Sequence, residues 1–310
     1  MKNYMKNHIY LLITPVKNEE ESLNRVADSV IKQTIKPELW IIVDDGSTDK
    51  TPLIIKELVN KCTWIKVITL QQGARDITYH YSYVCKQGFD FALKYSANNN
   101  IDYEYIALLD ADTLLVENYF EHIILKFEED SNLGIASGSI CYNHTCKLEI
   151  ETSSENLPRG TGRMWRRKCF FDTGGYIIEP SPDSISNVKA LKRGWKIRRF
   201  KDIMSIQTRY TSSAEGLWNG YKIKGNVSYY LNKHPLLIIL NTSYFLIKTP
   251  YYIGVAYLFG YLESLFKRKI KIEDKEIREY YWNERIREYK LMLVARIKNI
   301  CMCLAGKTKR

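Results

Sequence analysis

Short apolar runs alternate with amphipathic segments along the first third of the chain. Residues 8–14, 39–43, 65–70 and 105–109 are rich in Ile, Val and Leu, and each run has the length of a strand that is buried on both faces. Between the first two runs, apolar side chains recur at the spacing of a helix with one apolar stripe, at Leu23, Val26, Ala27, Val30 and Ile31. This alternation of strand and helix predicts a doubly wound α/β sheet.

Polar residues mark where the predicted helices begin. Asn18, followed by three glutamates at 19–21, predicts a cap and an acidic first turn for the first helix. Thr51 and Pro52 precede a second apolar stripe that begins at Leu53. Both helices therefore follow directly on the polar segments after strands, where ligands bind in doubly wound sheets.

The last third of the chain has a different composition, with apolar stretches followed by a basic tail. Two apolar stretches, 235–247 and 251–262, are interrupted at residues 248–250, and neither reaches the roughly 20 residues of a simple membrane span. Residues 267–310 then carry fourteen Lys and Arg against six Asp and Glu, so this tail holds +8 of the chain's net charge of +11. Acidic residues interrupt the basic tail and no recognition module is visible, which argues against nucleic-acid binding.

Two interpretations of this region remain open. The apolar stretches form either a helical hairpin or a pair of interfacial helices at a membrane, with tyrosines at headgroup depth and basic residues against anionic lipid. Alternatively, they pack on the main domain and the basic tail is only solvated. We expect membrane attachment, peripheral or monotopic, at the cytoplasmic face of the cell membrane.

Composition and cysteine usage narrow the class of protein. With 45% apolar and 26% charged residues, the chain of 310 residues has enough material for a packed core and is unlike disordered or disulfide-stapled chains. Its seven cysteines are an odd, scattered set, which favours a reducing, cytosolic setting. The first apolar run ends at Thr14, too early for a signal peptide, so we interpret it as a strand.

Acidic segments follow three of the predicted strands. They read TPVKNEE after the first strand, DDGSTD after the second and DAD at residues 110–112 after the fourth. We expect them to converge at one edge of the sheet, since the carboxyl ends of parallel strands meet there. Asp110 and Asp112 can both turn toward a hard divalent cation such as Mg²⁺ or Mn²⁺. The absence of G-x-G-x-x-G and P-loop sequences argues against dinucleotide and P-loop sites.

The three motifs ITPVKNEEESL, IIVDDGSTDKT and YIALLDADTLL, in this order and spacing, resemble the inverting family-2 glycosyltransferases over about residues 8–230. The resemblance implies the GT-A fold, a doubly wound mixed sheet flanked by helices. It also implies transfer of a sugar from a nucleotide-diphospho-sugar, with UDP as the default nucleotide, to an acceptor hydroxyl. We expect a glycosyltransferase domain at 1–230, with a nucleotide-sugar half at 1–115 and an acceptor half at 116–230, and a hydrophobic, then basic, helical region at 231–310.

The resemblance assigns roles to the residues after the first two strands. It implies that Pro15 and Val16 line the nucleoside site through backbone contacts, with Glu19 nearby. Asp45 is expected to bind the base, and Asp44 to support the loop.

The resemblance also assigns residues to the diphosphate. Asp112 is expected to hold Mn²⁺ or Mg²⁺, with Asp110 as a further ligand or a supporting partner that contacts the donor. Arg75 resembles the family's basic residue near the nucleotide, although an ordinary surface arginine is the alternative. Arg209, in the sequence QTRY, resembles part of the Gln-x-x-Arg-Trp element of processive synthases and is expected to stabilise the departing diphosphate. Because this element is one residue short and ends in Tyr, we favour addition of a single sugar.

The segment GTGRMWRR at 160–167, followed by a Gly-Gly turn, resembles the acceptor side of the family. Trp165 either stacks on a sugar or belongs to the core. The three arginines Arg163, Arg166 and Arg167 either meet an anionic acceptor or face solvent.

The catalytic base is expected about a dozen residues before the Gly194-Trp195 turn, where family members carry a Glu-Asp pair. This chain has Pro182 and Asp183 there, so the resemblance makes Asp183 the general base and marks the loss of the Glu. Asp172 and Glu179 are reserve candidates.

The sequence therefore predicts a metal-dependent, inverting glycosyltransferase that acts on a lipid-linked or envelope-glycan acceptor at a membrane. One alternative is a sugar nucleotidyltransferase, which would carry a Gly-rich basic loop near its N-terminus. Another is a non-catalytic, membrane-recruited protein that binds nucleotide sugars.

Overall fold

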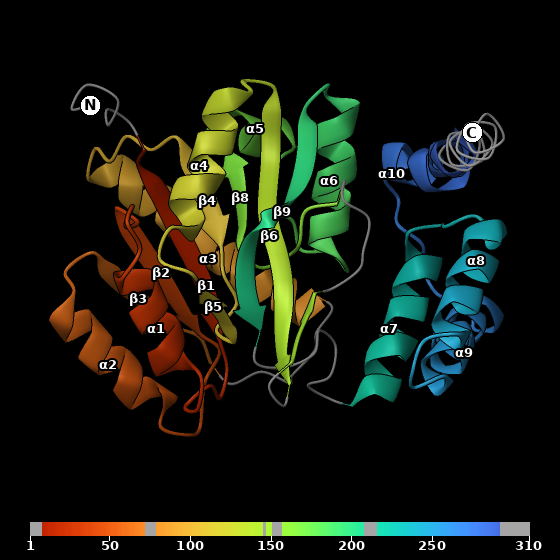
Figure 1. Cartoon of the computed structure of the whole chain (residues 1–310), viewed down its shortest axis with the longest axis horizontal. Helices are drawn as coiled ribbons and strands as arrows, with labels where there is room; N and C mark the ends of the chain where they lie inside the picture. Colours follow the sequence, from red (N-terminus) through yellow and green to blue (C-terminus); the bar gives the residue numbers. More distant parts are fainter. Residues whose placement is uncertain (1–7, 72–78, 145–146, 151–156, 208–215, 292–310) are drawn as a thin grey trace, which may run out of the picture. The chain divides into compact units, whose positions relative to one another are not determined.

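The computed structural model describes residues 8–71, 79–144, 147–150, 157–207 and 216–291 of the chain. It divides into two compact units, Met1–Tyr210 and Thr211–Arg310, which are seen in Figure 1. The division comes before helix α7 (Leu217–Tyr230), which the sequence assigned to the first domain. The physical reason is close packing of α7 on a later helix, because a Cβ added at Gly225 would lie 2.0 Å from the carbonyl oxygen of Tyr257.

The first unit is built on one mixed sheet, and its N-terminal half is parallel. The four predicted strands are confirmed as β1 (Tyr10–Val16), β2 (Leu39–Asp44), β3 (Ile65–Thr69) and β4 (Tyr105–Leu108). They lie in the order β3-β2-β1-β4, all parallel. Their carboxyl ends therefore lie at one edge, as the sequence predicts.

The other half of the sheet is mixed. Beyond β4 come β8 (Arg163–Arg166), β6 (Leu133–His144), β9 (Lys196–Gln207) and β5 (Thr113–Leu115), and β7 (Lys147–Ile150) pairs with β6. Strand β8 is antiparallel to both β4 and β6, whereas β9 is parallel to β6 and antiparallel to β5. The expected mixed sheet is thus confirmed.

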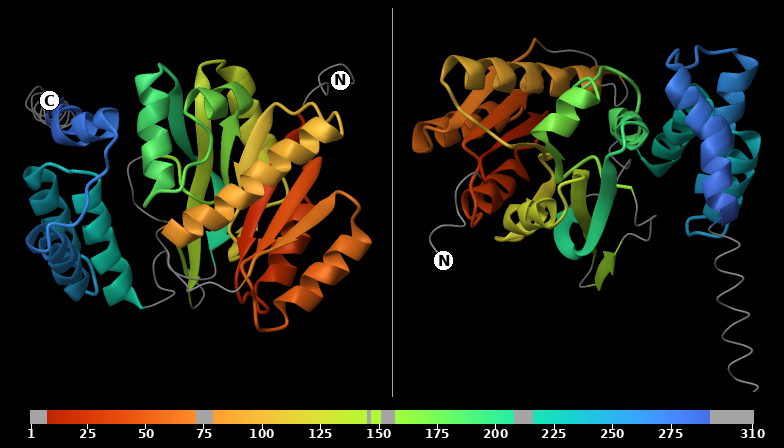
Figure 2. Two further views of the ribbon diagram at one scale, coloured as in Figure 1. Left: turned by 180° about the vertical axis from the view of Figure 1, so that it is seen from behind. Right: turned by 90° about the horizontal axis from the view of Figure 1, so that it is seen from above.

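Helices cover both faces of this sheet. One face packs against α1 (Leu23–Ile31), α2 (Thr51–Lys61) and α4 (Tyr119–Glu129). The other packs against α3 (Tyr79–Asn98), α5 (Arg167–Asp172) and α6 (Pro182–Lys192), as the view from behind in Figure 2 shows. In β1, Tyr10 and Leu12 enter the first core while Leu11 and Ile13 enter the second, which explains an unbroken apolar run.

Helix α3 lies unusually close to the sheet because it carries a glycine at the contact. A Cβ at Gly88 would lie 2.7 Å from side-chain carbons of both Ile13 and Val43. This contact fixes α3 across β1 and β2. The first turn of the helix is thereby held at the edge where the acidic segments lie.

The start of α1 differs from the prediction. The helix begins at Leu23 with no acidic residue in its first turn, and the expected cap, Asn18, has a φ of +53°. The three glutamates lie in the preceding turn, where the main-chain oxygen of Glu19 accepts hydrogen bonds from the nitrogens of Ser22 and Leu23. The expected capping role for Asn18 is therefore wrong, because its side chain is used by a neighbouring loop.

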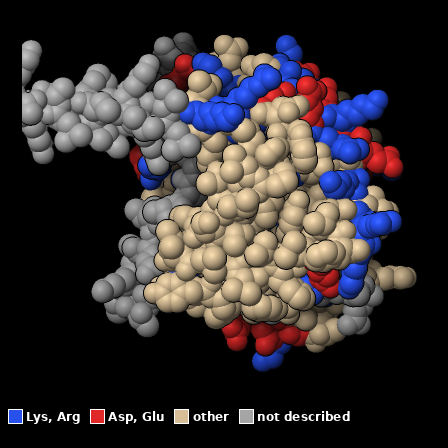
Figure 3. All heavy atoms as spheres, turned by 90° about the vertical axis from the view of Figure 1, so that its right-hand side faces the viewer, with Lys and Arg blue, Asp and Glu red and all other residues tan. Residues whose placement is uncertain are grey.

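The second unit is helical. After α7 come α8 (Pro235–Leu246), α9 (Tyr252–Phe266), α10 (Lys275–Glu279) and a π-helical turn at Tyr280–Glu284. Within the described residues, no helix has both the length and the apolar character required to cross a membrane. One side of this unit presents a broad surface without charged side chains (Figure 3).

Candidate active site

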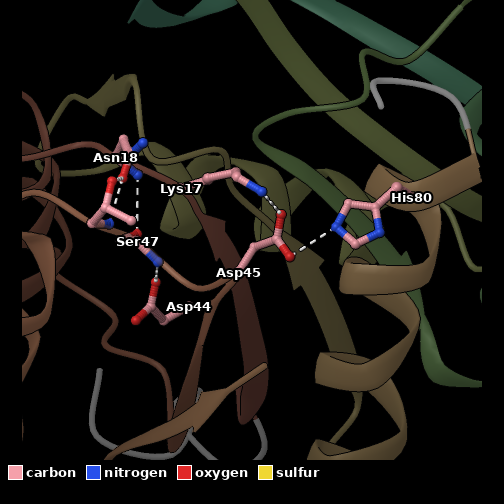
Figure 4. Close-up of polar contacts among 7 residues, drawn as sticks. Lys17, Asn18, Asp44, Asp45, Ser47 and His80 are labelled. Atoms are coloured by element: carbon pink, nitrogen blue, oxygen red, sulfur yellow. Dashed lines mark hydrogen bonds and ion pairs between the residues drawn. The ribbon is translucent and has the colours of Figure 1, made fainter. Parts of the chain in front are cut away.

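The loops after β1 and β2 are tied together by Asn18. Its main-chain nitrogen donates to Ser47 Oγ at 3.0 Å, and its Oδ1 accepts from the nitrogen of Thr48 at 2.8 Å (Figure 4). Two further bonds join the same loops, from the nitrogen of Glu19 to Thr51 Oγ1 and from the nitrogen of Lys50 to a carboxylate oxygen of Glu20. Two segments about thirty residues apart in the sequence thus form one rigid wall.

Asp45 lies at the centre of this wall and has two cationic or polar partners. Lys17 Nζ contacts its Oδ2 at 2.9 Å, and His80 Nε2 contacts its Oδ1 at 2.8 Å (Figure 4). The neighbouring Asp44 is also buried, and its Oδ1 accepts from the nitrogen of Ser47 at 3.0 Å. Asp44 therefore shapes the turn, whereas Asp45 is held in a fixed orientation from both sides.

The other residues that were expected at the nucleoside site lie beside this wall. The buried Val16 accepts a hydrogen bond from the nitrogen of Asp45 at 2.9 Å, and Pro15 precedes it at the half-buried end of β1. The carboxylate of Glu19 accepts from Ser22 Oγ at 2.6 Å. The structure thus brings Pro15, Val16, Glu19 and Asp45 together.

Asp110 and Asp112 are both half-buried at the end of β4. Tyr81 donates its hydroxyl to Asp110 Oδ1 at 2.6 Å, and the nitrogen of Asp110 donates to Thr161 Oγ1 at 2.9 Å. Desolvation, with a smaller contribution from the charge of Asp112, raises the pKa of Asp110 to about 7. Asp112 accepts from Gln207 Nε2 at 3.3 Å. The two carboxylates are close enough to repel each other, and a cation between them would relieve that repulsion.

Within the described ranges, no group of three or more His, Cys, Asp and Glu side chains is arranged to hold a metal ion. The pair Asp110 and Asp112 nevertheless fits a hard divalent cation, since both offer oxygen ligands and repel each other without one. Such a pair leaves coordination positions for ligands from outside the protein. Mg²⁺ characteristically shares its ligands with substrate phosphates in this way.

Asp183 lies in the first turn of α6. Ser181, with a φ of +62°, donates its hydroxyl to Asp183 Oδ1 at 3.0 Å. Pro182 is buried at the start of the helix, a position that suits proline because the missing N–H has no partner there in any helix. The helix therefore begins without the family's glutamate, and its one first-turn carboxylate is half-buried.

The segment 160–161 places Asp183 near the Asp110 carboxylate. A Cβ added at Gly160 would lie 4.0 Å from Asp183 Oδ2, and the next residue, Thr161, binds the nitrogen of Asp110. Burial raises the pKa of the Tyr176 phenol well above the ordinary value, and the neighbouring Cys85 and the charges of Asp183 and Asp110 add smaller contributions. The structure thus brings the expected base and the expected metal ligands into one site.

The aromatic and basic residues after Gly160 are structural. Trp165 is buried against Phe89 and donates Nε1 to Ser186 Oγ at 3.0 Å, so of the two interpretations the core one is correct. Arg163 is 0% exposed, stacks 4.6 Å from the Trp165 ring and donates Nη2 to Asn187 Oδ1 at 2.7 Å. Its burial lowers the pKa of the guanidinium to about 10.

The other two arginines of this segment are also engaged by the protein. Arg166 donates to the carbonyl oxygens of Phe127 at 2.6 Å and Leu133 at 3.1 Å. Arg167 forms an ion pair with the exposed Asp102 at 2.9 Å. Neither of the two interpretations holds for Arg163, which lies in the core, or for Arg166, which binds main-chain oxygens, whereas Arg167 lies at the surface beside Asp102.

The reserve bases lie in other surroundings. Asp172, at the end of α5, accepts from Trp195 Nε1 at 3.0 Å, and Glu179 lies half-buried before α6. Arg75 and Arg209 lie outside the described residues.

Sequence reasoning missed His80, Tyr81 and Thr161. The signal for the first two was their position after the third strand, where α/β sheets bind ligands. Their roles nevertheless depend on the close approach of α3 to the sheet. Thr161 lies in the segment that resembles the acceptor side of the family, and nothing in that segment predicted its bond to the main-chain nitrogen of Asp110.

Comparison with known proteins places the chain in a family. Residues 11–178, more than half of the chain, match the model of glycosyl transferase family 2, and the chain belongs to that family. A relative of known function, the minor teichoic acid biosynthesis protein GgaB of Bacillus subtilis, is 30% identical over 128 residues. That match covers 41% of this chain but only 13% of GgaB.

Two solved structures share the fold. The mannosyltransferase PcManGT from Pyrobaculum calidifontis, in complex with GDP-Man and Mn²⁺, has a TM-score of 0.55 at 12% identity, over 84% of this chain and 88% of that one. Residues 1–349 of S. aureus TarS, in complex with UDP-GlcNAc, have a TM-score of 0.50 at 15% identity, over 87% of this chain and 78% of that one. At these identities the likeness establishes the fold alone.

Proposed function

We propose that the chain transfers a sugar from a nucleotide-diphospho-sugar to an acceptor hydroxyl with inversion, in the synthesis of a lipid-linked or envelope glycan. The observation that carries this proposal is the gathering of Asp45, Asp110 and Asp112 at the carboxyl edge of one sheet, with Asp183 beside the segment that binds Asp110, in a member of glycosyl transferase family 2. The role of GgaB in teichoic acid biosynthesis supports a glycan of the envelope.

The donor's nucleotide is proposed to lie against the wall formed by the loops after β1 and β2. Asp45 keeps lone pairs beyond those used by Lys17 and His80, and a carboxylate can accept the ring N–H of uracil. Nucleotide sugars bound to the neighbours of this fold, UDP-GlcNAc in TarS and GDP-Man in PcManGT, support a donor of this class. UDP is our first choice. Arg75 is proposed to meet the nucleotide.

Asp112, with Asp110, is proposed to hold Mn²⁺ or Mg²⁺. When bound, the cation supplies positive charge that stabilises a departing nucleoside diphosphate. Tyr81 and Thr161 hold Asp110 through its carboxylate and main-chain nitrogen, so the pair keeps its orientation. Arg209 is proposed to add a further positive charge beside the diphosphate.

Asp183 is proposed to act as the general base. The acceptor oxygen forms a bond to the anomeric carbon while the bond from that carbon to the diphosphate oxygen breaks, and the hydroxyl proton passes to Asp183. Attack on the face opposite the leaving group inverts the anomeric centre. The half-buried carboxylate, fixed by Ser181, is accessible to a substrate and has a defined direction.

The test is nucleotide release from UDP-, GDP- and dTDP-sugars with Mn²⁺ or Mg²⁺ and a membrane lipid extract, with the wild-type chain and Asp112→Ala. We expect release from one donor that depends on the extract and is lost in the variant. Asp172→Ala, a carboxylate outside the proposed site, is the matched control and should retain activity.

Two results would contradict the proposal. Formation of a nucleotide sugar from a sugar phosphate and a nucleoside triphosphate would identify a nucleotidyltransferase. Donor binding without release, in the presence of every acceptor fraction, would identify a non-catalytic binding protein.

A further inference from the structure

The second unit exposes a continuous apolar surface on α8 and α9, called here the α8–α9 face. Its outward side chains include Ile239, Tyr244, Ile247, Tyr251, Phe259 and Phe266, of which Ile247 is 79% and Phe266 80% exposed. Figure 3 shows this side of the unit as a broad area without charged atoms. Soluble monomers rarely expose a contiguous apolar patch of more than a few hundred Å².

The apolar side chains face outward because the opposite side of α9 is already packed. Gly260 adjoins α7 so closely that an added Cβ would lie 2.0 Å from the carbonyl oxygen of Lys222. The buried Ala256 and Tyr257 lie on the same side, and Tyr257 donates its hydroxyl to Ser228 Oγ of α7 at 2.9 Å. Helix α9 is therefore apolar on both sides, whereas a helix at a water-exposed surface has one polar side.

Charged residues are nearly absent from the two helices that form the face. Between residues 235 and 266 the only charged residues are Lys248 and Glu263. Glu263 contacts Lys222 at 3.0 Å and Lys267 at 2.9 Å, and these contacts lower its pKa to about 2. Lys248 lies exposed between the two helices.

Three successive cations follow the end of α9, at residues 267–269, and all three are exposed. The hairpin thus carries a cation at its turn and a basic cluster at its other end, with apolar side chains between them. The tyrosines at 244, 251 and 252 suit the headgroup region, since tyrosine has an apolar ring and a polar tip.

We propose that the α8–α9 face lies in the interfacial layer of an anionic lipid bilayer, without crossing it. An anionic lipid layer suits this face better than a second copy of the chain does, because its headgroups can meet Lys248 and the cations at 267–269 together while the apolar side chains between them enter the acyl boundary. Apolar burial would hold the helices in the headgroup and acyl boundary, and the cations would face lipid phosphates. This inference concerns a surface and does not depend on the proposed sugar transfer.

The test is flotation of the full chain with vesicles of phosphatidylcholine alone and of phosphatidylcholine mixed with phosphatidylglycerol. The wild-type chain should float with the anionic vesicles. The variant Ile239→Gln/Phe259→Gln keeps every charge, and its binding should fall about tenfold or more at any salt concentration. The variant Lys267→Gln/Arg268→Gln/Lys269→Gln should bind the anionic vesicles about a hundredfold more weakly at low salt. At high salt the loss of binding should be much smaller, because screening already weakens the attraction between the cations and the lipid phosphates.

The control variant is Leu53→Gln/Leu125→Gln, which removes two exposed apolar side chains, 62% and 44% exposed, from the first unit. It should bind vesicles as the wild type does. Circular dichroism of every variant should match the wild type, because all substituted side chains are exposed.

Three results would overturn the inference. The first is a wild-type chain that does not float with anionic vesicles, and the second is a variant Ile239→Gln/Phe259→Gln that binds them as tightly as the wild type does. The third is a dimer, seen by light scattering, that this variant dissociates while vesicle binding is absent. Nucleotide release measured in parallel separates the two proposals, since flotation without release would contradict only the sugar transfer.

Discussion

Replacing Asp183 by Asn tests the proposed chemistry at one atom. Asn keeps the shape of the side chain, and its Oδ1 can still accept the hydroxyl of Ser181, which lies 3.0 Å away in the wild type. The substitution removes the negative charge and the capacity to take a proton at the acceptor hydroxyl. The structure of the site should therefore persist while the proton transfer fails.

The expected loss follows from the contribution of a positioned general base. Such a base contributes about 10²- to 10⁴-fold to a rate, which corresponds to about 3 to 5 kcal/mol in the activation free energy. The effect on stability should be much smaller, because the lost interaction of a carboxylate with the first turn of α6 is worth about 0.3 to 1 kcal/mol. The donor affinity should be unchanged, since the carboxylate of Asp45 is held by Lys17 and His80 rather than by Asp183.

The assay combines transfer kinetics with donor binding by calorimetry and a urea unfolding curve. Asp172→Asn is the matched control, because its carboxylate accepts from Trp195 outside the site and the variant should keep its rate. Transfer by Asp183→Asn within about threefold of wild type, with normal donor binding, would refute the assignment of the base. Loss of donor binding together with transfer would indicate a different role for this carboxylate.

Three further predictions follow from the packing. Tyr81→Phe removes the hydroxyl that Asp110 accepts at 2.6 Å and should weaken Mn²⁺ binding, followed by calorimetry, about tenfold without changing the fold. Gly260→Ala would place a Cβ 2.0 Å from the main-chain oxygen of Lys222 and should lower the free energy of unfolding by about 3 kcal/mol in urea. Burial raises the pKa of the Cys85 thiol to about 12, against about 8.5 in the unfolded chain. Between these two pH values the unfolded chain loses the thiol proton and the folded chain keeps it, so the free energy of unfolding should fall as the pH rises. The fall should be smaller in Cys85→Ala.

Each of these has a distinct control. Tyr83→Phe changes an exposed tyrosine on the same helix and should leave Mn²⁺ binding unaltered. Gly160→Ala, whose Cβ would approach an atom only at 4.0 Å, should cost far less stability than Gly260→Ala. Equal losses of stability in the two glycine variants would contradict the packing argument. Parallel profiles of stability against pH for the wild type and Cys85→Ala would contradict the titration argument.

The location of the acidic segments was predictable from the sequence, but their contacts were not. Their order and their positions after apolar runs predicted that they share one edge, since parallel strands end on the same side of a sheet. Their individual partners were not predictable. The sequence suggests that Asn18 is a helix cap, but in the fold it binds Ser47 and Thr48 of the loop after β2, and α1 begins only at Leu23.

The acceptor side was less accessible to sequence reasoning. A cluster of arginines beside a tryptophan suggested a surface for an anionic substrate. In the fold, Trp165 and Arg163 stack in the interior, because β8 lies in the middle of the sheet and alternate residues of such a strand enter a core. The position of β8 is set by pairing with β4 and β6, which no local pattern encodes.

The sequence by itself determined strands β1 to β4, the presence of α1 and α2, the edge at which the acidic loops meet and the membership of a family of glycosyltransferases. These features depend on local periodicity and on the fixed direction of parallel strands. Only the tertiary structure decided which partners hold Asp45 and Asp110, that Arg163 belongs to the core, and that α7 packs with α9. Those outcomes depend on contacts between segments far apart in the chain, where close approach at a glycine or pairing of a distant strand selects one neighbour among many.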